Sequence, residues 1–304
     1  MQTQEVLLSE MDASVNFVTK GDYPGMIEAR YVRRSPDYFI IYLSSQTGCQ
    51  KACRFCHLTQ TGQTAYQDVT LEQYMDQADR VFSHYDQQEQ PARSVHFNFM
   101  SRGEVFANQL LLNGAGSELI DGLKRRAVQR GLIPRIKFST IMPKELDQIE
   151  LADLFPGHNP DIYYSLYSMD PNFRKHWMPK ALPAEQSLEK LLRWQQLTRK
   201  IPVLHWALIE GENDDEDTID TICAAVNAIG LRADFNLVRY NPFSDRQGRE
   251  PEIEVIERVA GQLAAGVPGT KVKIVGRVGY DVKASCGMFV PGPERSKRLL
   301  QVME

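Results

Sequence analysis

Three cysteines in one short stretch are the residues of this chain with the clearest chemical potential. They are Cys49, Cys53 and Cys56, spaced as C-x3-C-x2-C. Three thiolates hold three irons of a [4Fe-4S] cube and leave the fourth iron open to a small molecule. A structural zinc site is the alternative, since zinc also accepts three cysteines and a histidine such as His57. The spacing favours the cluster, and the surrounding fold must provide the context.

The two remaining cysteines lie far from this motif. Cys223 falls on the apolar stripe of a predicted helix, where a buried and inert cysteine is expected. Cys286 lies in a short semi-polar stretch after the last predicted strand. As a free thiol it is a candidate fourth cluster ligand, a nucleophile or a spectator. The odd count of five cysteines favours metal or catalytic use over a disulfide framework.

The N-terminal residues, which precede the cysteine motif, have a less regular hydrophobic pattern than the rest of the chain. Residues 1–16 are poorly patterned and suggest a short helix or arm, and residues 18–31 read as a hairpin around a Gly/Pro turn. Residues 38–43 form an apolar run that is typical of a strand buried on both faces of a parallel sheet. The cysteine motif follows directly after this strand.

From there predicted strands and helices alternate. Strands are expected at 94–99, 135–140, 161–167, 203–209, 233–238 and 271–275, and helices from a capping box at 70–73 and at 117–131, 144–154, 184–199, 216–229 and 252–265. Repeated β-α units predict a parallel sheet with right-handed crossovers. We therefore expect an α/β fold, a partial (β/α)6 barrel at 37–290, with an N-terminal arm and β-hairpin extension at 1–36 and a C-terminal tail at 291–304.

Further polar residues fall at the carboxyl ends of these strands, where such barrels place their chemistry. Gly103 and Glu104 follow the second barrel strand, where a glycine lets backbone groups approach a ligand and a carboxylate can accept an ammonium group. A plain turn is the alternative for this pair taken alone. Ser139 and Ser165 end the next two strands, as hydroxyl donors at the same rim or as caps of the following loops.

The composition is that of an ordinary globular protein. The chain has 304 residues, 42% hydrophobic and 24% charged, with no apolar run long enough for a membrane span and no signal-peptide pattern. We therefore expect a cytoplasmic protein with no membrane association. The net charge of −4 argues against a strong nonspecific grip on nucleic acid. Residues 30–34 and 124–126 are local basic clusters, of the kind that is more often a solvated face than a binding site.

Taken together, the motifs resemble the RlmN/Cfr family, the class A radical S-adenosylmethionine (SAM) methylases that methylate adenine in ribosomal RNA and, for RlmN, in transfer RNA. The likeness runs from about residue 17 to 298. Its landmarks are residues 44–56, 99–104, 139–143, 165–179, 213–214, 236–243 and 279–287. An aromatic residue before the last cluster cysteine, here Phe55, is part of the similarity.

The resemblance implies a radical SAM fold, a [4Fe-4S] cluster and bound S-adenosyl-L-methionine. It implies cluster ligands at Cys49, Cys53 and Cys56 and SAM contacts at Phe55, Gly103, Glu104, Ser139, Ser165 and Asn241. Cys286 would carry a methyl group from one SAM. A second SAM would supply the 5′-deoxyadenosyl radical that removes a hydrogen from this methyl, so that the carbon adds to adenine. The expected partners are a reductant protein such as flavodoxin or ferredoxin and a nucleic acid or nucleotide substrate.

The chain also departs from the family pattern. Tyr42 stands seven residues before Cys49, where the family has a second catalytic cysteine. The family's Gly-x-Gly-Glu-Pro element reads Ser-Arg-Gly-Glu-Val at 101–105, Tyr167 replaces a histidine, and residues 205–206 read His-Trp in place of Glu-Tyr. The family's N-terminal helical RNA-binding domain is expected to be absent.

Two rival hypotheses follow from these departures. In the first, the 5′-deoxyadenosyl radical acts directly on a nucleotide or small metabolite, without methyl transfer through Cys286. In the second, the chain is a metal-stabilised nucleic-acid-binding protein without catalysis, in which aromatic side chains stack on bases. The aromatic candidates for that role are Trp177, Trp206, Tyr163, Tyr164 and Tyr167.

Overall fold

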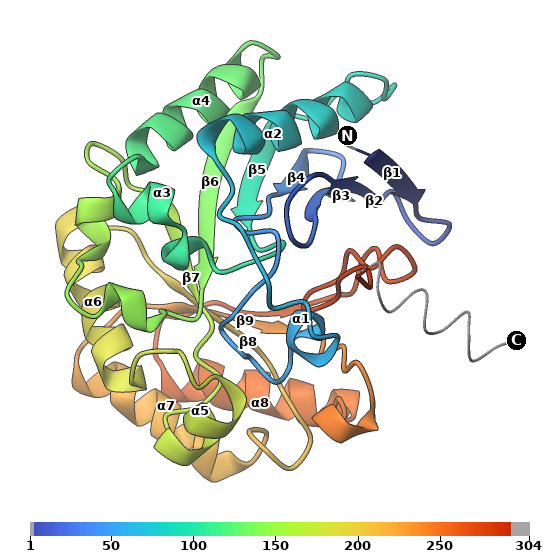
Figure 1. The fold of residues 1–304 in the computed structure, drawn as a ribbon. Coiled ribbons are helices and arrows are strands. Elements are labelled where there is room, and N and C mark those ends of the chain that lie inside the picture. The colour runs from blue at the N-terminus through green and yellow to red at the C-terminus, as the bar shows by residue number, and fades with distance from the viewer. Residues whose placement is uncertain (1–2, 293–304) are drawn as a thin grey trace, which may run out of the picture.

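A single twisted sheet organises the molecule, as a computed structural model covering residues 3–292 shows. Within these residues ten strands pair in chain order from β1 to β10 (Figure 1). The strands are β1 (Thr3–Leu8), β2 (Val15–Lys20), β3 (Ile27–Ser35), β4 (Tyr38–Tyr42), β5 (Ser94–Phe99), β6 (Ile133–Thr140), β7 (Asp161–Tyr164), β8 (Val203–Ala207), β9 (Asp234–Val238) and β10 (Val272–Val275). Strands β1 to β4 pair antiparallel. From β4 to β10 every pairing is parallel.

The helices lie on the outside of this sheet (Figure 1). They are α1 (His57–Gln60), α2 (Leu71–Tyr85), α3 (Gln109–Leu112), α4 (Gly116–Val128), α5 (Pro171–Trp177), α6 (Ala184–Thr198), α7 (Glu216–Ala228) and α8 (Ile253–Gly266). Four short 3-10 turns add η1 (Val105–Ala107), η2 (Lys144–Leu146), η3 (Leu151–Leu154) and η4 (Asp245–Gln247). Crossovers between parallel strands place such helices on the outer face and leave the inner face to a lumen.

The predicted architecture is confirmed: strands β4 to β9 are each followed by helical segments, and β10 extends the parallel part. Within the described residues the edge strands β1 and β10 do not pair with each other, so the sheet is a partial barrel. Local signals explain most elements. At α2, for example, the Thr70 hydroxyl accepts from the Gln73 backbone N–H and the Gln73 side chain accepts from the Thr70 N–H, so the expected capping box is present.

Two expectations about the elements are wrong. Residues 3–8 form an edge strand paired with β2, where a helix or arm was expected. Almost all of this strand is exposed, so no alternation of apolar residues marks it in the sequence. The helix expected at 144–154 is two separate 3-10 turns, η2 and η3. Between them Lys190 of α6 donates to the carbonyl oxygen of Ile149 at 3.0 Å, so a tertiary contact takes an acceptor that a continuous helix would use.

Two further strands end earlier than expected. Strand β7 ends at Tyr164, because Tyr167 has a left-handed backbone with φ of 61°. Strand β8 ends at Ala207, after which the Asn213 side chain accepts from the backbone N–H of Ile209 at 2.7 Å. No helix in the described part of the chain is long and apolar enough to span a membrane. The tail expected at 291–304 lies almost wholly outside the described residues.

Candidate active site

The three cysteines of the motif lie on the loop between β4 and α1. Cys56 is the N-cap residue of α1, and its backbone N–H donates to the Cys53 carbonyl at 3.1 Å. The Cys49 N–H donates to the carbonyl of Gln63 at 3.1 Å, which returns the loop onto itself. All three side chains line one cavity, which we call the cysteine cavity. The cavity is also lined by all the other predicted site residues: Phe55, Gly103, Glu104, Ser139, Ser165, Asn241 and Cys286.

The electrostatics of the three thiols reflect their burial and their proximity to one another. Burial, with a smaller contribution from the nearby Cys56, raises the pKa of Cys49 to about 12. Burial also raises the pKa of Cys53, with Cys49 and Cys56 adding to the effect. Thiols that repel each other as anions are the donor set that a positively charged metal centre stabilises as thiolates.

Three thiolates are a donor set that suits a [4Fe-4S] cluster, which takes one thiolate on each of three irons. Among residues 3–292 no group of three His, Cys, Asp or Glu side chains is arranged around one ion. A cube separates its thiolates, each on its own iron. His57, the fourth ligand of the zinc alternative, lies with its Nε2 3.0 Å from the carbonyl oxygen of Asn241.

The glycine-glutamate pair follows β5 and is held by the cysteine loop. Gly103 has a φ of +90°, and a Cβ added there would lie 2.6 Å from both the backbone N and the Cβ of Gln46. The buried Glu104 carboxylate accepts from the backbone N–H groups of Phe106 at 3.1 Å and Ile141 at 3.0 Å. Burial raises the pKa of Glu104, and these two donors oppose the rise. Its oxygens are thereby held in a fixed orientation at the cavity wall.

The remaining predicted contacts also line the cysteine cavity. The Ser139 hydroxyl donates to Asn98 Oδ1 at 3.2 Å, and the Ser165 N–H donates to the Thr140 carbonyl at 2.8 Å. The ring of Phe55 stacks on Tyr167 with centroids 4.4 Å apart and planes 11° apart. The cavity therefore has hydroxyl groups on two adjacent strands and an aromatic wall on the cysteine loop.

Cys286, although more than 200 residues away in sequence, lies beside the cysteine loop. The Asn241 side chain donates to its carbonyl oxygen at 3.0 Å, and the His57 N–H donates to the carbonyl of Gly287 at 3.0 Å. The Cys286 side chain is exposed and faces the cavity. Burial of the thiol by the surrounding protein raises its pKa to about 11. The positive charge of Arg30 opposes that rise. Cys223, in contrast, is buried on α7, as predicted.

A second cavity begins at Cys286 and occupies the inside of the barrel; we call it the lumen cavity. Its lining comes from the inner faces of β4 to β10 and from residues 276–278 and 284–286, together with Arg30 and Arg34 of β3. Met100, His205, Val238, Arg239, Asn241 and Cys286 line both cavities. Tyr42 lines the lumen cavity with Cys286, and the electrostatic influence of Cys286 on Tyr42 marks the two side chains as neighbours. Burial raises the pKa of Tyr42.

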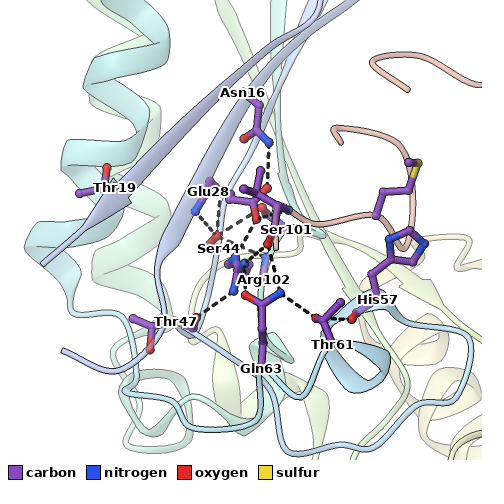
Figure 2. A network of polar contacts seen from close by, with 12 residues as sticks. Asn16, Thr19, Glu28, Ser44, Thr47, His57, Thr61, Gln63, Ser101 and Arg102 are labelled. Carbon is purple, nitrogen blue, oxygen red and sulfur yellow. Dashed lines mark hydrogen bonds and ion pairs between the residues drawn. The ribbon is translucent and has the colours of Figure 1, made fainter. Parts of the chain in front are cut away.

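A buried network of charges holds the Cys286 segment in place (Figure 2). Its centre is Glu28 of β3, whose carboxylate accepts from Arg102 Nε at 2.8 Å and Arg30 Nη2 at 3.0 Å. Arg30 also donates to the carbonyl of Met288 at 2.7 Å, and Arg102 to that of Val290 at 3.0 Å. The Val290 N–H in turn donates to Glu28 at 3.1 Å. Figure 1 shows this last segment, in red, beside the N-terminal strands.

The network also reaches the cysteine loop. Arg102 donates to the Gln63 side chain at 2.6 Å, and Gln63 donates to the Thr61 hydroxyl at 2.8 Å (Figure 2). Burial by itself would raise the pKa of Glu28, but Arg102 and Arg30 together hold that pKa below its ordinary value. Sequence reasoning missed this network and treated the basic cluster at 30–34 as a solvated face. Arg30 is in fact 2% exposed, and the available signal was a glutamate and an arginine two residues apart in the otherwise apolar first part of β3, residues 27–32.

Comparisons with known proteins agree with this arrangement. No family model matches the chain. A Helicobacter hepaticus protein named dual-specificity RNA methyltransferase RlmN is 25% identical over 257 residues, covering 81% of this chain and 63% of that protein. Its namesake from Wolinella succinogenes is 27% identical over 264 residues, covering 83% and 66%. The crystal structure of a radical SAM methyltransferase from Sphaerobacter thermophilus matches with a TM-score of 0.78 at 18% identity, over 94% of this chain and 80% of that chain. The chain is thus similar to proteins named RlmN, at 25% and 27% identity for these two relatives.

The resemblance to RlmN inferred from the motifs is thus confirmed, and the solved structure confirms the partial-barrel fold. The RlmN-like chain spans slightly less than two thirds of the length of these two relatives. Its departures from the family pattern gather at the cavities: Tyr42 lines the lumen cavity, Tyr167 the cysteine cavity, and His205 both. Trp177, Trp206 and Tyr164 are buried, so they offer no exposed stacking surface for bases.

Proposed function

We propose that this chain is a radical SAM enzyme, a methyltransferase that uses Cys286 as a methyl carrier to modify a carbon of an adenine-like nucleobase in nucleic acid or a nucleotide. The observation that carries the proposal is the meeting of Cys286 with the three-cysteine loop at one cavity. The family to which the relatives belong supports the reaction class, because those relatives are named as RNA methyltransferases.

In this proposal the cysteine cavity holds both cofactors. Cys49, Cys53 and Cys56 would ligate the [4Fe-4S] cluster, and Glu104, Ser139, Ser165 and Asn241, which line the same cavity, would contact SAM. SAM would supply an electrophilic methyl group. The cluster and SAM together, after electron transfer from a donor such as flavodoxin or ferredoxin, would supply a hydrogen-abstracting 5′-deoxyadenosyl radical. Gly103 would let the backbone approach the bound SAM, since its missing Cβ leaves space against Gln46.

The part played by Cys286 follows from its position. In the first step its thiol proton would leave to solvent and its sulfur would take the methyl group of SAM, with S-adenosylhomocysteine as the leaving group. Cys286 would then hold this methyl carbon against an electron-poor ring carbon of the acceptor, and the cluster and SAM would supply the hydrogen-abstracting chemistry that activates it. A thiol with a pKa of about 11 is mostly protonated at neutral pH, so the nearby positive charge of Arg30 assists the first step.

A second candidate function is favoured by Tyr42. In the family a second cysteine near the methyl-carrying one helps release the product, and a phenol cannot form a disulfide with Cys286. Because Tyr42 occupies that position beside Cys286, the alternative is that the 5′-deoxyadenosyl radical acts directly on a nucleotide or small metabolite. Both candidates share the cluster and SAM, and they differ in whether Cys286 is methylated.

One experiment tests the proposal and separates the two candidates. The protein is reconstituted anaerobically with iron and sulfide, reduced, and incubated with methyl-labelled SAM. We expect a [4Fe-4S] spectrum, reductive cleavage of SAM, and label on Cys286 found by peptide mass spectrometry. Cys286→Ala should keep SAM cleavage and lose methyl transfer, with Cys223→Ala as the matched control. An unlabelled Cys286 together with a fully active Cys286→Ala variant leaves the direct-radical candidate, and failure to bind a cluster ends both.

A further inference from the structure

The inner wall of the barrel is polar around the lumen cavity. Each parallel strand, from β4 to β10, contributes at least one polar side chain to the lining of this cavity. The interior of a (β/α) barrel is usually a packed core in which branched apolar side chains dominate. A polar wall around an open cavity is therefore suited to a ligand rather than to core packing.

One row of this wall runs across strands β4, β5 and β6. Asn98 of β5 is the register partner of both Tyr42 and Lys137, so the three side chains lie next to one another on the inner face. On the following strand, the Tyr163 hydroxyl lies 3.1 Å from Lys137 Nζ. The ring of Tyr163 contacts that of His205 on β8 edge to face, with centroids 6.0 Å apart. Tyr163 thus connects this row to the next strands of the barrel.

A second row runs across strands β8, β9 and β10. Asn236 of β9 is the register partner of both His205 and Lys273, and all three side chains line the lumen cavity. His205 is 7% exposed, and among the described residues neither of its ring nitrogens has a hydrogen-bond partner. Buried polar atoms are nearly always paired in proteins, so two unpaired nitrogens beside a cavity point to a ligand. We call the two rows, together with Tyr163, the polar belt.

The ionised groups of the polar belt carry one sign of charge. Within the described residues no aspartate or glutamate lines the lumen cavity. Asp161 is the register partner of Lys137, but its carboxylate lies 2.9 Å from Lys200 Nζ. Burial, with smaller contributions from the positive charges of Arg135 and Lys273, lowers the pKa of Lys137 to about 8, and Asp161 opposes the change. The ammonium groups of β6 and β10 thus act on each other across the cavity, although three strands lie between them in the sheet.

The two lysines of the polar belt differ from the other basic residues of the cavity. Four arginines also line it, and three of them already have a carboxylate partner. Arg30 is paired with Glu28, and Arg239 and Arg277 share Glu250. Within the described residues neither lysine of the belt forms an ion pair with a carboxylate. An anion between the two lysines would offset both the burial and the mutual repulsion of their ammonium groups.

We propose that the polar belt is the acceptor site, and that it binds a phosphate group of the acceptor between Lys137 and Lys273. This assignment rests on the proposed function, which supplies a nucleobase-bearing acceptor whose reacting carbon lies at Cys286. Cys286 lines the same cavity as the belt. The acceptor also gives a partner to the unpaired ring of His205. A phosphate is common to a free nucleotide and to a polynucleotide backbone, and either source provides the anion for the two lysines.

The test measures binding to the cluster-loaded protein by anaerobic calorimetry. The probes are adenosine, which has no phosphate, AMP, which has a terminal phosphate, and the dinucleotide ApA, which has a phosphodiester. We expect at least one phosphate-bearing probe to bind at least about tenfold more tightly than adenosine. A gain for AMP alone assigns the phosphate to a free nucleotide, and a gain for ApA alone assigns it to a polynucleotide backbone. A gain for both shows that the belt accepts either ester.

Substitutions of the belt locate this gain in affinity. Lys137→Met and Lys273→Met should each weaken binding of the phosphate-bearing probe by about tenfold and leave adenosine binding unchanged, while Lys137→Arg retains the gain. His205→Phe should also weaken binding, because the ring loses both of its polar atoms. The matched control is Lys180→Met, which removes an exposed lysine that lines neither cavity and should change no affinity.

Two results would overturn the assignment: equal affinities for adenosine and both phosphate-bearing probes, or a gain that survives in both lysine variants. An affinity that His205→Phe leaves unaltered would overturn the part given to His205. Binding does not depend on SAM cleavage or on methylation of Cys286. A protein that methylates Cys286 but binds all three probes equally refutes only this assignment, and one that shows the phosphate gain without methylating Cys286 refutes only the methyl-carrier function.

Discussion

At the scale of single residues, Glu28 is the side chain on which the most buried contacts depend. Glu28 is fully buried, and it is the shared acceptor of Arg30, Arg102, Asn16 and the backbone of Val290. Removing one partner of a buried ion pair leaves the others charged and desolvated, which costs far more than the loss of an exposed pair. The carboxylate of Glu28 therefore has an effect on stability beyond its own contacts.

We expect Glu28→Gln to lower the free energy of unfolding by about 3–5 kcal/mol, because two buried guanidinium groups lose their counter-charge. The measurement is urea unfolding at pH 7. Glu5→Gln is the matched control: Glu5 lies on β1, and its partner Lys20 is 3.7 Å away on the surface. That change should cost at most about 1 kcal/mol. Equal losses in the two variants would contradict the role given to Glu28.

The same carboxylate makes stability depend on pH. The folded-state pKa of Glu28 lies below its ordinary value, since Arg102 and Arg30 outweigh the opposite effect of burial. Its contribution is therefore fully present above the ordinary glutamate pKa of about 4.3 and is lost as the pH falls through the lower folded-state pKa. We expect the stability difference between wild type and Glu28→Gln to be constant down to about pH 5 and to shrink below about pH 4. A difference that stays constant to pH 2 would rule this out.

Gly103 offers a residue-scale test of the rim of the cysteine cavity. We expect Gly103→Ala to destabilise the protein and to weaken SAM binding, because the new methyl group would collide with the backbone of Gln46 at 2.6 Å. Gly114→Ala is the control, since Gly114 has nearly the same φ, +87°, with nothing within 4 Å of the added carbon. Backbone strain alone costs about 1–2 kcal/mol at both positions. Thermal unfolding and SAM titration should show the larger effect at Gly103.

At the scale of elements, the segment that carries Cys286 has little regular structure of its own. Its position depends on contacts from β3, from the loop after β5 and from the cysteine loop. The ring of Phe289 lies under both Arg30 and Arg102, at 4.8 and 5.7 Å from its centroid. The position of the Cys286 segment thus depends on side chains from the first third of the chain, together with Asn241, which donates to the Cys286 carbonyl.

We expect Arg102→Met to loosen this segment without unfolding the barrel. Hydrogen exchange of the Val290 amide, which is bonded to Glu28, should become at least about tenfold faster. The Ala284 amide is bonded locally to the carbonyl of Gly279 at 2.7 Å and provides the internal control. Arg130→Met, which removes a surface pair with Asp86, should change neither amide. If Val290 and Ala284 accelerate together, the network does not hold the segment selectively.

The elements also show what a sequence can and cannot predict. Helix α2 and strands β4 and β5 carry strong local signals, a capping box and apolar runs, and were predicted within a few residues. Residues 144–154 carry helical spacing, but a lysine from α6 captures a carbonyl in their middle. Strand β1 is exposed and carries no pattern. Tertiary partners and exposed edges leave no periodic trace in the sequence, so these two segments could not be predicted correctly.

For the whole molecule, the motif residues were predictable as a set because parallel strands bring their carboxyl ends together. The sequence also pointed to Cys286, through a motif that only the family resemblance made specific. Beyond the Glu28 and Arg30 pair in β3, the network could not be predicted, since its partners are separated by up to 262 residues and no spacing rule connects them. The positive charge of the lumen cavity could not be predicted from the sequence for a similar reason. Its six basic residues are far apart in the sequence, and the net charge of the whole chain is −4.

The contact between Glu28 and Val290 has a consequence for the order of events during synthesis. At about 5–20 residues per second, a ribosome needs tens of seconds to add the 262 residues that separate them. The cysteine loop is already complete early in that interval, and the segment that packs beside it does not yet exist. Until the segment around Val290 has been synthesised, Cys49, Cys53 and Cys56 therefore lack one wall of the cavity that they line in the complete fold.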